Sequence, residues 1–209
     1  MENYEKETIA AIATALSDSG IGIVRISGEN AIYIVDSIFR SASGKKILTK
    51  VQSHMIHYGY IVDKDENIID EVMTSVMKAP KSYTMEDTVE INCHGGVLVM
   101  QKVLETVLQA GARLAEPGEF TKRAFLNGRI DLSRAEAVID VIHSQNEYAL
   151  SSSVSQLKGR LSDKIRSLRE DILYQIAFIE SALDDPEHIS LEGYPEQLAE
   201  KVTGFEKEI

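Results

Sequence analysis

Strand-like and helix-like runs of apolar residues are mixed in the first part of the chain. Strands are predicted over 8–14, 21–26, 54–62, 72–77 and 88–93, where apolar and β-branched residues cluster or alternate with polar ones. Amphipathic helices are predicted over 30–39 and 97–110, because apolar residues recur there every three to four positions. The mixture indicates an α+β fold.

The pattern becomes helical after Pro117. An apolar series from Leu150 to Leu183 advances in steps of four, three and four residues. Such an 11-residue repeat keeps one continuous stripe on a nearly straight helix, so a single long helix is predicted over 148–184, roughly 55 Å in length. We interpret the stripe as packing in a helical bundle. Two domains are therefore expected, an α+β domain over 1–118 and a helical segment over 119–209.

Turn and capping residues are concentrated in the segment 115–137. A proline-glycine pair at 117–118 and an asparagine-glycine pair at 127–128 favour turns. Ser133 and Glu136 have the spacing of a capping box, in which the serine begins a helix. The segment is therefore predicted to form a turn, a short helix, a second turn and a longer helix.

The same segment is rich in charge. Its spacing predicts that Lys122, Arg123 and Arg129 lie near Glu119 and Asp131. Cations held on a fixed backbone can bind an anionic ligand. The alternative is a surface connector held by salt bridges, which contribute little to stability.

Arg25 lies in an otherwise apolar strand. Alternation places it on the same face as Ile21 and Ile23, so a guanidinium emerges from an apolar surface. Such a charge requires an anionic partner. That partner is either a carboxylate of the protein or a bound ligand.

Glu90 lies in another predicted strand, on the face opposite to Ile91 and Cys93. A carboxylate there can accept two parallel N–H donors from the ring of a ligand. The alternative is that Glu90 pairs with Arg25 inside the fold. We interpret His94 and the two glycines after it as a structural turn leading into a helix.

The net charge of −11 is unevenly distributed. Residues 120–170 hold nine Lys/Arg against six Asp/Glu, whereas the segments on either side are acidic. A broad nucleic-acid footprint is therefore not expected. The one cysteine excludes an internal disulfide and a cysteine-clustered metal site within one chain. No metal site is predicted.

No membrane segment is expected. Residues 1–6 carry acids and no apolar run, so they do not resemble a secretion signal. No later stretch approaches the roughly 18 apolar residues of a membrane span. These patterns predict a cytoplasmic protein. The last residues, 204–209, continue an amphipathic pattern without a cap, so we expect a fragment that stops within a helical element.

Three dense motifs give this chain a family resemblance. They are IGIVRISG at 21–28, KSYTMEDTVEINCHGG at 81–96 and PGEFTKRAFLNG at 117–128. In this order they resemble the tRNA modification GTPases of the MnmE (TrmE) family. The N-terminal domain of that family is similar to the tetrahydrofolate-binding part of aminomethyltransferases, so the resemblance implies a mixed α/β folate-binding domain followed by helices.

The resemblance also implies a cofactor site. The folate-contacting positions of the family fall on Arg25, Glu90 and Arg129, and the last of these is usually lysine. The implied ligand is 5-formyl- or 5,10-methylene-tetrahydrofolate, bound at a homodimer interface. The family works with an FAD-dependent partner of the MnmG/GidA type to modify carbon 5 of the wobble uridine in certain tRNAs. No residue is predicted to act as a nucleophile or general base.

In the family, GTP, Mg²⁺ and K⁺ belong to a domain inserted after such helices. Gly44, Lys45 and Lys46 lack the upstream glycine and the hydroxyl of a P-loop, so this chain is not expected to hydrolyse GTP. Two departures from the family pattern, at 15–19 and at Met85, are expected to alter loop shape near the folate. The alternatives are a stand-alone folate-dependent transferase and a pure dimerisation scaffold.

Overall fold

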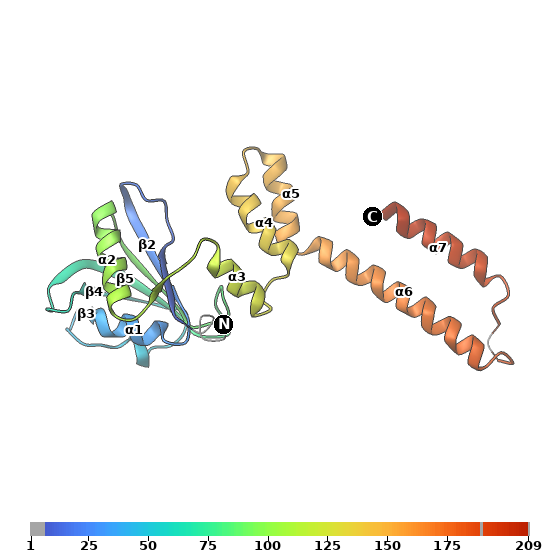
Figure 1. The fold of residues 1–209 in the computed structure, drawn as a ribbon, viewed down its shortest axis with the longest axis horizontal. Coiled ribbons are helices and arrows are strands. Elements are labelled where there is room, and N and C mark those ends of the chain that lie inside the picture. The colour runs from blue at the N-terminus through green and yellow to red at the C-terminus, as the bar shows by residue number, and fades with distance from the viewer. Residues whose placement is uncertain (1–6, 189, 209) are drawn as a thin grey trace. The chain divides into compact units, whose positions relative to one another are not determined.

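The computed structural model describes residues 7–188 and 190–208. The residues on which the predicted lack of a secretion signal depends, 1–6, lie outside this range, as does residue 209 at the end of the chain. The chain divides into two compact units, 1–130 and 131–209. Each is described by itself (Figure 1).

The first unit contains, within the described residues, a seven-stranded sheet with the order β3-β4-β5-β6-β2-β1-β7. Neighbouring strands pair antiparallel except β1 and β7, which are parallel. The strands are β1 (Ile9–Ile12), β2 (Ser19–Ser27), β3 (Phe39–Ser41), β4 (Met55–Val62), β5 (Ile68–Met77), β6 (Thr88–Gly95) and β7 (Arg113–Leu114). The helical elements are α1 (Ala31–Ile38), the 3₁₀ turn η2 (Leu48–Lys50), α2 (Val97–Gln109) and α3 (Glu119–Leu126).

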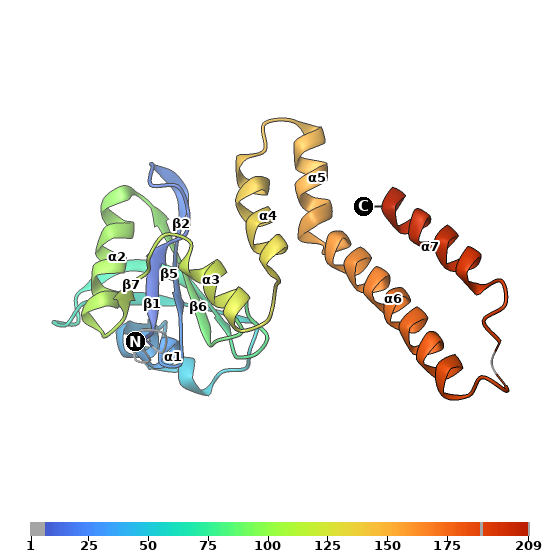
Figure 2. The same ribbon diagram turned by 45° about the vertical axis from the view of Figure 1, so that its right-hand side comes forward.

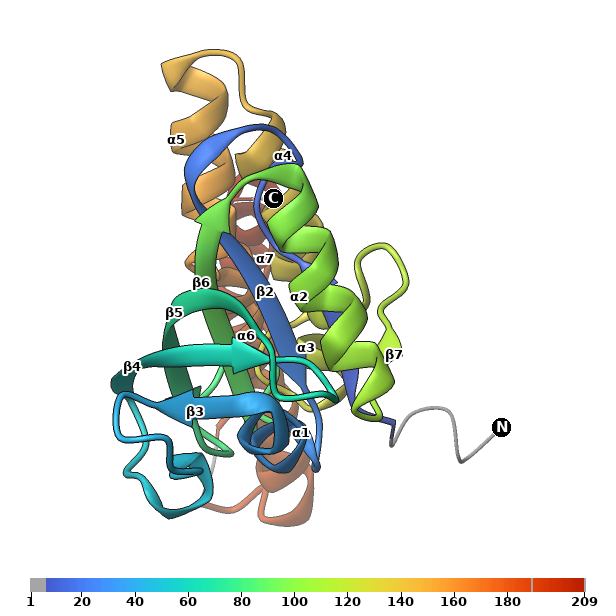
Figure 3. The same ribbon diagram turned by 90° about the vertical axis from the view of Figure 1, so that its left-hand side faces the viewer.

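Helices α1 and α2 cover one face of this sheet (Figure 3). Alternate residues of the central strands are fully buried beneath them, such as Val24 in β2 and Ile91 in β6. Val35 of α1 and Met100 of α2 pack into the same core. Period-two burial explains why these segments form strands rather than helices. The α+β prediction is confirmed.

The opposite face of the sheet is more open. Four of its large apolar side chains are 47–65% exposed. These side chains are Ile21 of β2, Ile56 and Tyr58 of β4, and Met73 of β5. Because side chains alternate along a strand, Arg25 and Glu90 lie on this face while their neighbours in sequence face the core. The predicted orientation of both strands is confirmed.

The second unit consists of helices within the described residues. These are α4 (Leu132–His143), α5 (Glu147–Leu157), α6 (Arg160–Asp184) and α7 (Tyr194–Glu208). Helices α4 and α5 pack against each other, and α7 returns beside α6 (Figure 2). The contact between α6 and α7 includes a hydrogen bond from the hydroxyl of Tyr194 to the side chain of Gln175, 3.0 Å long.

The prediction of one helix over 148–184 is wrong. The chain leaves the helical path between α5 and α6, where Gly159 has a φ of +86°. This left-handed conformation ends a helix and suits glycine. A Cβ atom at Gly159 would also collide with the guanidinium of Arg134. The apolar stripe continues across a break that its period does not reveal.

The predicted cap of α4 also needs correction. Asp131, rather than Ser133, is the N-cap, and its carboxylate accepts a 2.9 Å hydrogen bond from the backbone N–H of Arg134. The hydroxyl of Ser133 donates to that same carboxylate. The hydroxyl of Ser162 in α6 also donates to it, at 2.6 Å. Asp131 therefore joins the start of α4 to α6.

Helix α3 belongs to the first unit, although the sequence-based division at residue 118 assigned it to the helical segment. Its buried Arg123 bonds to Glu86 before β6, and its Thr121 bonds to Tyr83. These contacts hold α3 against the sheet domain. Of the helices in the described residues, none combines the length and the apolarity that crossing a bilayer requires.

Candidate ligand-binding site

Arg25 and Glu90 form the centre of the candidate site. They are direct cross-strand partners in β2 and β6, and Nε of Arg25 donates to Oε1 of Glu90 at 2.8 Å. Both side chains are partly accessible, at 29% and 22%. In the described part of the chain, Oε2 of Glu90 accepts no hydrogen bond. The pairing that sequence analysis held as an alternative is present, and it leaves one carboxylate oxygen open.

Two aromatic rings lie beside Arg25. Its Cζ is 5.5 Å from the ring centroid of Tyr83 and 5.6 Å from that of Phe120, which is within the range of cation–π attraction. Tyr83 comes from the loop before β6 and Phe120 from the first turn of α3. The rings bring two segments that are distant in sequence to the same guanidinium.

Arg129 reaches the same place from the turn after α3. The turn contains Gly128 at a φ of +76°, as the asparagine-glycine signal predicted. Cζ of Arg129 lies 4.8 Å from the centroid of Tyr83. The structure therefore brings Arg25 and Arg129 together at one tyrosine, with Glu90 paired to Arg25.

Hydrogen bonds fix the loop that carries Tyr83. The side-chain amide of Asn127 donates to the carbonyl of Thr84 at 2.7 Å. The hydroxyls of Thr84 and Ser27 are 2.6 Å apart, and those of Tyr83 and Thr121 are 2.9 Å apart. The loop is thus held from β2, from α3 and from the turn that precedes Arg129.

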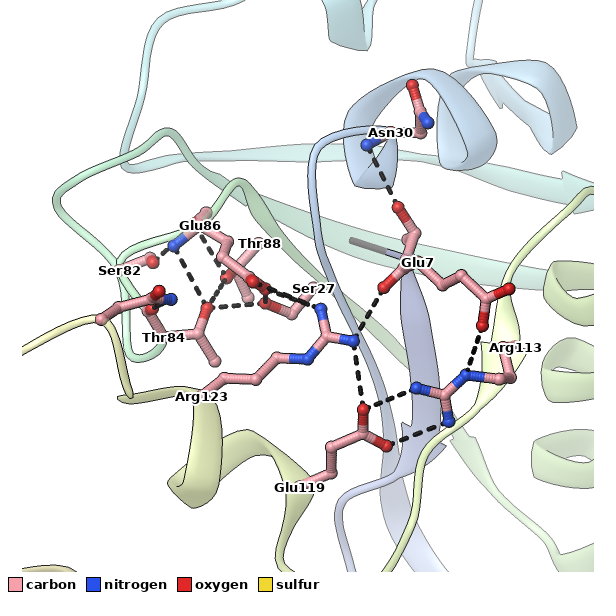
Figure 4. A network of polar contacts seen from close by, with 12 residues as sticks. Glu7, Ser27, Asn30, Ser82, Thr84, Glu86, Thr88, Arg113, Glu119 and Arg123 are labelled. Carbon is pink, nitrogen blue, oxygen red and sulfur yellow. Dashed lines mark hydrogen bonds and ion pairs between the residues drawn. The ribbon is translucent and has the colours of Figure 1, made fainter. Parts of the chain in front are cut away.

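Helix α3 also contributes two side chains, Glu119 and Arg123, to a buried network of charges (Figure 4). The guanidinium of Arg123 donates to both oxygens of Glu86 at 3.2 Å, to Glu119 at 3.1 Å and to the carbonyl of Glu7 at 2.8 Å. Arg113 donates to both oxygens of Glu119. The side chain of Arg123 is only 6% exposed. This arginine is therefore a structural residue.

Burial would raise the pKa of Glu119, but hydrogen bonds from Arg113, from the backbone N–H of Glu116 and from Arg123 outweigh it. Together they lower this pKa to about 2. Glu119 is therefore ionised at neutral pH and neutralises part of the surrounding positive charge. The network presents little net charge to a ligand.

The prediction that Lys122, Arg123 and Arg129 form one group near Glu119 and Asp131 is therefore wrong in part. Arg123 does pair with Glu119, one helical turn away. Asp131 instead lies in the second unit, where it caps α4. Among residues 7–188 and 190–208, no carboxylate lies within ion-pair distance of Arg129.

His94 and Met85 have local roles. The ring and the backbone N–H of His94 both bond to Asp70, at 2.7 and 2.8 Å. The bond from the ring and the negative charge of Asp70 raise the pKa of His94. The interpretation of His94 and its two glycines as a turn is wrong in part, because His94 and Gly95 belong to the end of β6 and only Gly96 separates that strand from α2. Met85, at a position where the family pattern has glycine, adopts a φ of +62°. The loop thus has the left-handed conformation that glycine favours.

Comparisons with known proteins identify the family of the chain. Residues 8–129 match the family described as "GTP-binding protein TrmE N-terminus". Residues 132–209 match "MnmE helical domain". The chain belongs to the MnmE (TrmE) family. The first match includes the strands, loop, helix and turn that position Arg25, Glu90 and Arg129.

Curated MnmE relatives are similar to nearly the whole chain. The tRNA modification GTPase MnmE of Lachnoclostridium phytofermentans is 62% identical over 203 residues, and that of Bacillus subtilis is 51% identical over 205 residues. Each alignment covers 97% of this chain but 44% of the relative. The chain therefore spans less than half the length of these MnmE proteins.

Sequence analysis missed Tyr83 and Phe120 as members of the site. Both lie in the motifs that carried the MnmE resemblance, at 81–96 and 117–128. Their location within these motifs was the only sign in the sequence that they could belong to the site. Their proximity to Arg25 depends on how α3 packs beside the sheet, which the spacing of residues along the chain does not show.

Proposed function

We propose that the first unit binds a one-carbon derivative of tetrahydrofolate through Arg25, Glu90 and Arg129. The observation that carries this proposal is that Arg25, with Glu90 paired to it, and Arg129 both lie beside Tyr83, although the three side chains come from three separate elements. The motif resemblance implies that the corresponding positions of the family contact the folate. The family resemblance suggests the ligand class, and the geometry is compatible with it.

Each side chain has a distinct proposed role. The open oxygen of Glu90 accepts N–H groups of the pterin ring, while the bond from Arg25 to Oε1 fixes the carboxylate. Arg129 binds a polar or anionic part of the cofactor, because the described residues supply it with no carboxylate. We assign no nucleophile or general base, so the chain orients the carbon carrier, which is 5-formyl- or 5,10-methylene-tetrahydrofolate.

The wider function follows from the relatives, which are named tRNA modification GTPases. We propose that this chain is the front part of such a cytoplasmic protein, acting with an FAD-dependent partner of the MnmG/GidA type on the wobble uridine of certain tRNAs. GTP, Mg²⁺ and K⁺ then belong to the rest of the full-length protein. The 209 residues contain no P-loop motif, so GTP hydrolysis is not proposed for this chain alone.

We also propose that the first unit forms a homodimer. Its open sheet face supports this, because large apolar side chains on neighbouring strands remain about half exposed, including Ile56, Tyr58 and Met73. Contiguous exposed apolar surface is characteristic of association sites. The same observation favours the second candidate function, a dimerisation scaffold without ligand affinity.

Calorimetric titration with 5-formyltetrahydrofolate, with the molar mass measured in the same buffer, separates these functions. We expect saturable binding by a dimer. The Glu90→Ala variant should lose at least tenfold in affinity while it remains dimeric, because a hydrogen bond to a charged group contributes about 1.5–3 kcal/mol.

Glu66→Ala is the matched control. Glu66 also pairs with an arginine, Arg40, but this exposed pair lies outside the candidate site. We expect the Glu66→Ala variant to bind the folate with the affinity of the wild-type chain. A wild-type dimer without detectable binding would make the chain a scaffold, and equal loss of binding and dimerisation in Glu90→Ala would refute the ligand role of Glu90.

A further inference from the structure

The two arginines of the candidate site have different partners. Arg25 contacts a carboxylate, Glu90, and two aromatic rings. Arg129 contacts the ring of Tyr83, and the described residues place no carboxylate near it. The pair of Arg25 and Glu90 is electrically neutral, so the positive charge of this site resides on Arg129.

An aromatic ring and a carboxylate affect a guanidinium differently. A carboxylate orients the guanidinium and also cancels its charge. The face of a ring attracts the cation through its quadrupole but carries no net charge. A guanidinium held by a ring therefore remains fully charged toward an approaching anion. It also loses less rotamer freedom when the anion binds, which is a part of the usual cost of association.

We infer that Tyr83 is a positioning residue, which holds Arg129 in place for an anionic group of the ligand without neutralising it. This inference rests on the proposed folate site. Folates carry carboxylates at the end opposite the pterin ring, so Arg129 binds a carboxylate while Glu90 binds the ring. Tyr83 contacts Arg25 as well, and it thereby fixes the relative position of the two ends of the site.

The hydroxyl of Tyr83 has a separate role. It lies 2.9 Å from the hydroxyl of Thr121 in α3, so it ties the loop to the helix, and it forms no hydrogen bond with Arg25 or Arg129. Tyr83→Phe removes this bond and keeps the ring. Tyr83→Leu removes the ring and keeps an apolar side chain of moderate size.

Titration calorimetry with 5-formyltetrahydrofolate tests the inference in a double-mutant cycle. The cycle consists of the wild-type chain, Tyr83→Leu, Arg129→Ala and the double variant, with Tyr83→Phe measured beside them. We expect Tyr83→Leu to weaken binding about five- to tenfold and Tyr83→Phe to stay within about threefold of wild type. In the Arg129→Ala background, Tyr83→Leu should weaken binding by less than about twofold further.

Phe120→Leu is the matched control for loss of a ring. The ring of Phe120 lies beside Arg25, and the described residues show no cation–π contact between it and Arg129, so its effect should add to that of Arg129→Ala. Thermal midpoints of all variants show whether the fold is retained. If Tyr83→Leu does not fold, Tyr83→Met takes its place in the cycle, because it also removes the ring.

The outcomes separate the inference from the proposal beneath it. If the wild-type chain does not bind the folate, both fail. If it binds and Tyr83→Leu binds equally well, only the role of Tyr83 is refuted. Additive effects of Tyr83→Leu and Arg129→Ala would also refute it, because Tyr83 would then act independently of Arg129.

Discussion

The regions around Arg123 and Arg129 show two uses of the same side chain within one short segment. Arg123 is buried and contacts Glu86, Glu119 and a backbone carbonyl (Figure 4). Arg129 is exposed and contacts the ring of Tyr83. The carboxylates around Arg123 satisfy its charge, whereas the described residues place no carboxylate against Arg129, as its proposed binding role requires. The partners of an arginine, rather than its presence in a charged segment, distinguish a structural role from a binding role.

The largest expected effect is on the structural side of this comparison. Arg123→Leu leaves Glu86 without its cationic partner in a partly buried network, so we expect the first unit to lose about 3–5 kcal/mol of stability. Hydrogen exchange of the amides in β2 and β6 measures this loss in the first unit alone. Arg166→Leu is the control, because Arg166 forms an exposed pair with Asp163, and it should change stability by less than about 1 kcal/mol.

Lowering the pH should reduce the stability that the network around Arg123 contributes, whereas Arg129 should contribute nothing to this pH dependence. The pKa of Glu119 is lowered in the folded state to about 2, so its contribution to stability is present above its unfolded pKa of about 4.3 and is lost as the pH falls through 2. The stability of the first unit, followed by hydrogen exchange from pH 6 to 3, should decrease less steeply in Glu119→Gln. Arg129→Ala should leave the slope unchanged, and an equal effect of both variants would contradict the comparison.

A smaller effect is expected in the loop that joins the two regions. Met85 has a φ of +62°, which costs a non-glycine residue roughly 1–2 kcal/mol. Glycine adopts it freely but gains entropy in the unfolded chain. Met85→Gly should therefore stabilise the loop by about 0.5–1 kcal/mol, measured as slower exchange at the amides of 82–88. Faster exchange there would show that the methionine side chain stabilises the loop.

The smallest effect is expected for Arg129→Lys. The position is usually lysine in the family pattern, and lysine keeps the cation while losing the planar guanidinium. We expect folate affinity to stay within about threefold of wild type in a calorimetric titration. A loss as large as that of Arg129→Ala would mean that hydrogen-bond geometry, rather than charge, determines binding at this position.

Strand alternation predicted the faces of β2 and β6 correctly, and with them the positions of Arg25 and Glu90, because period two is a local property of the chain. The break at Gly159 could not be predicted, since the apolar period continues across it. The cap at Asp131 was missed because Ser133 matched a familiar spacing. Both features depend on backbone conformation rather than on residue type.

The contacts of α3 could not be predicted either. The pairing of Arg123 with Glu86 and the contact of Arg129 with Tyr83 each join residues more than 35 positions apart. The packing of α3 beside the sheet decides which arginine is buried and which meets a ring. The spacing of residues 115–137 correctly indicated an unusual segment. It wrongly placed the cations of that segment in a single group.

The measurement that tests the central claim most directly is a parallel titration of the wild-type chain and Arg129→Ala with 5-formyltetrahydrofolate, with thermal unfolding of both. The account predicts saturable binding by the wild type and at least tenfold weaker binding by Arg129→Ala, with an unchanged unfolding midpoint. Equal affinity of the two proteins would contradict the assignment of Arg129 as the cation that binds the ligand.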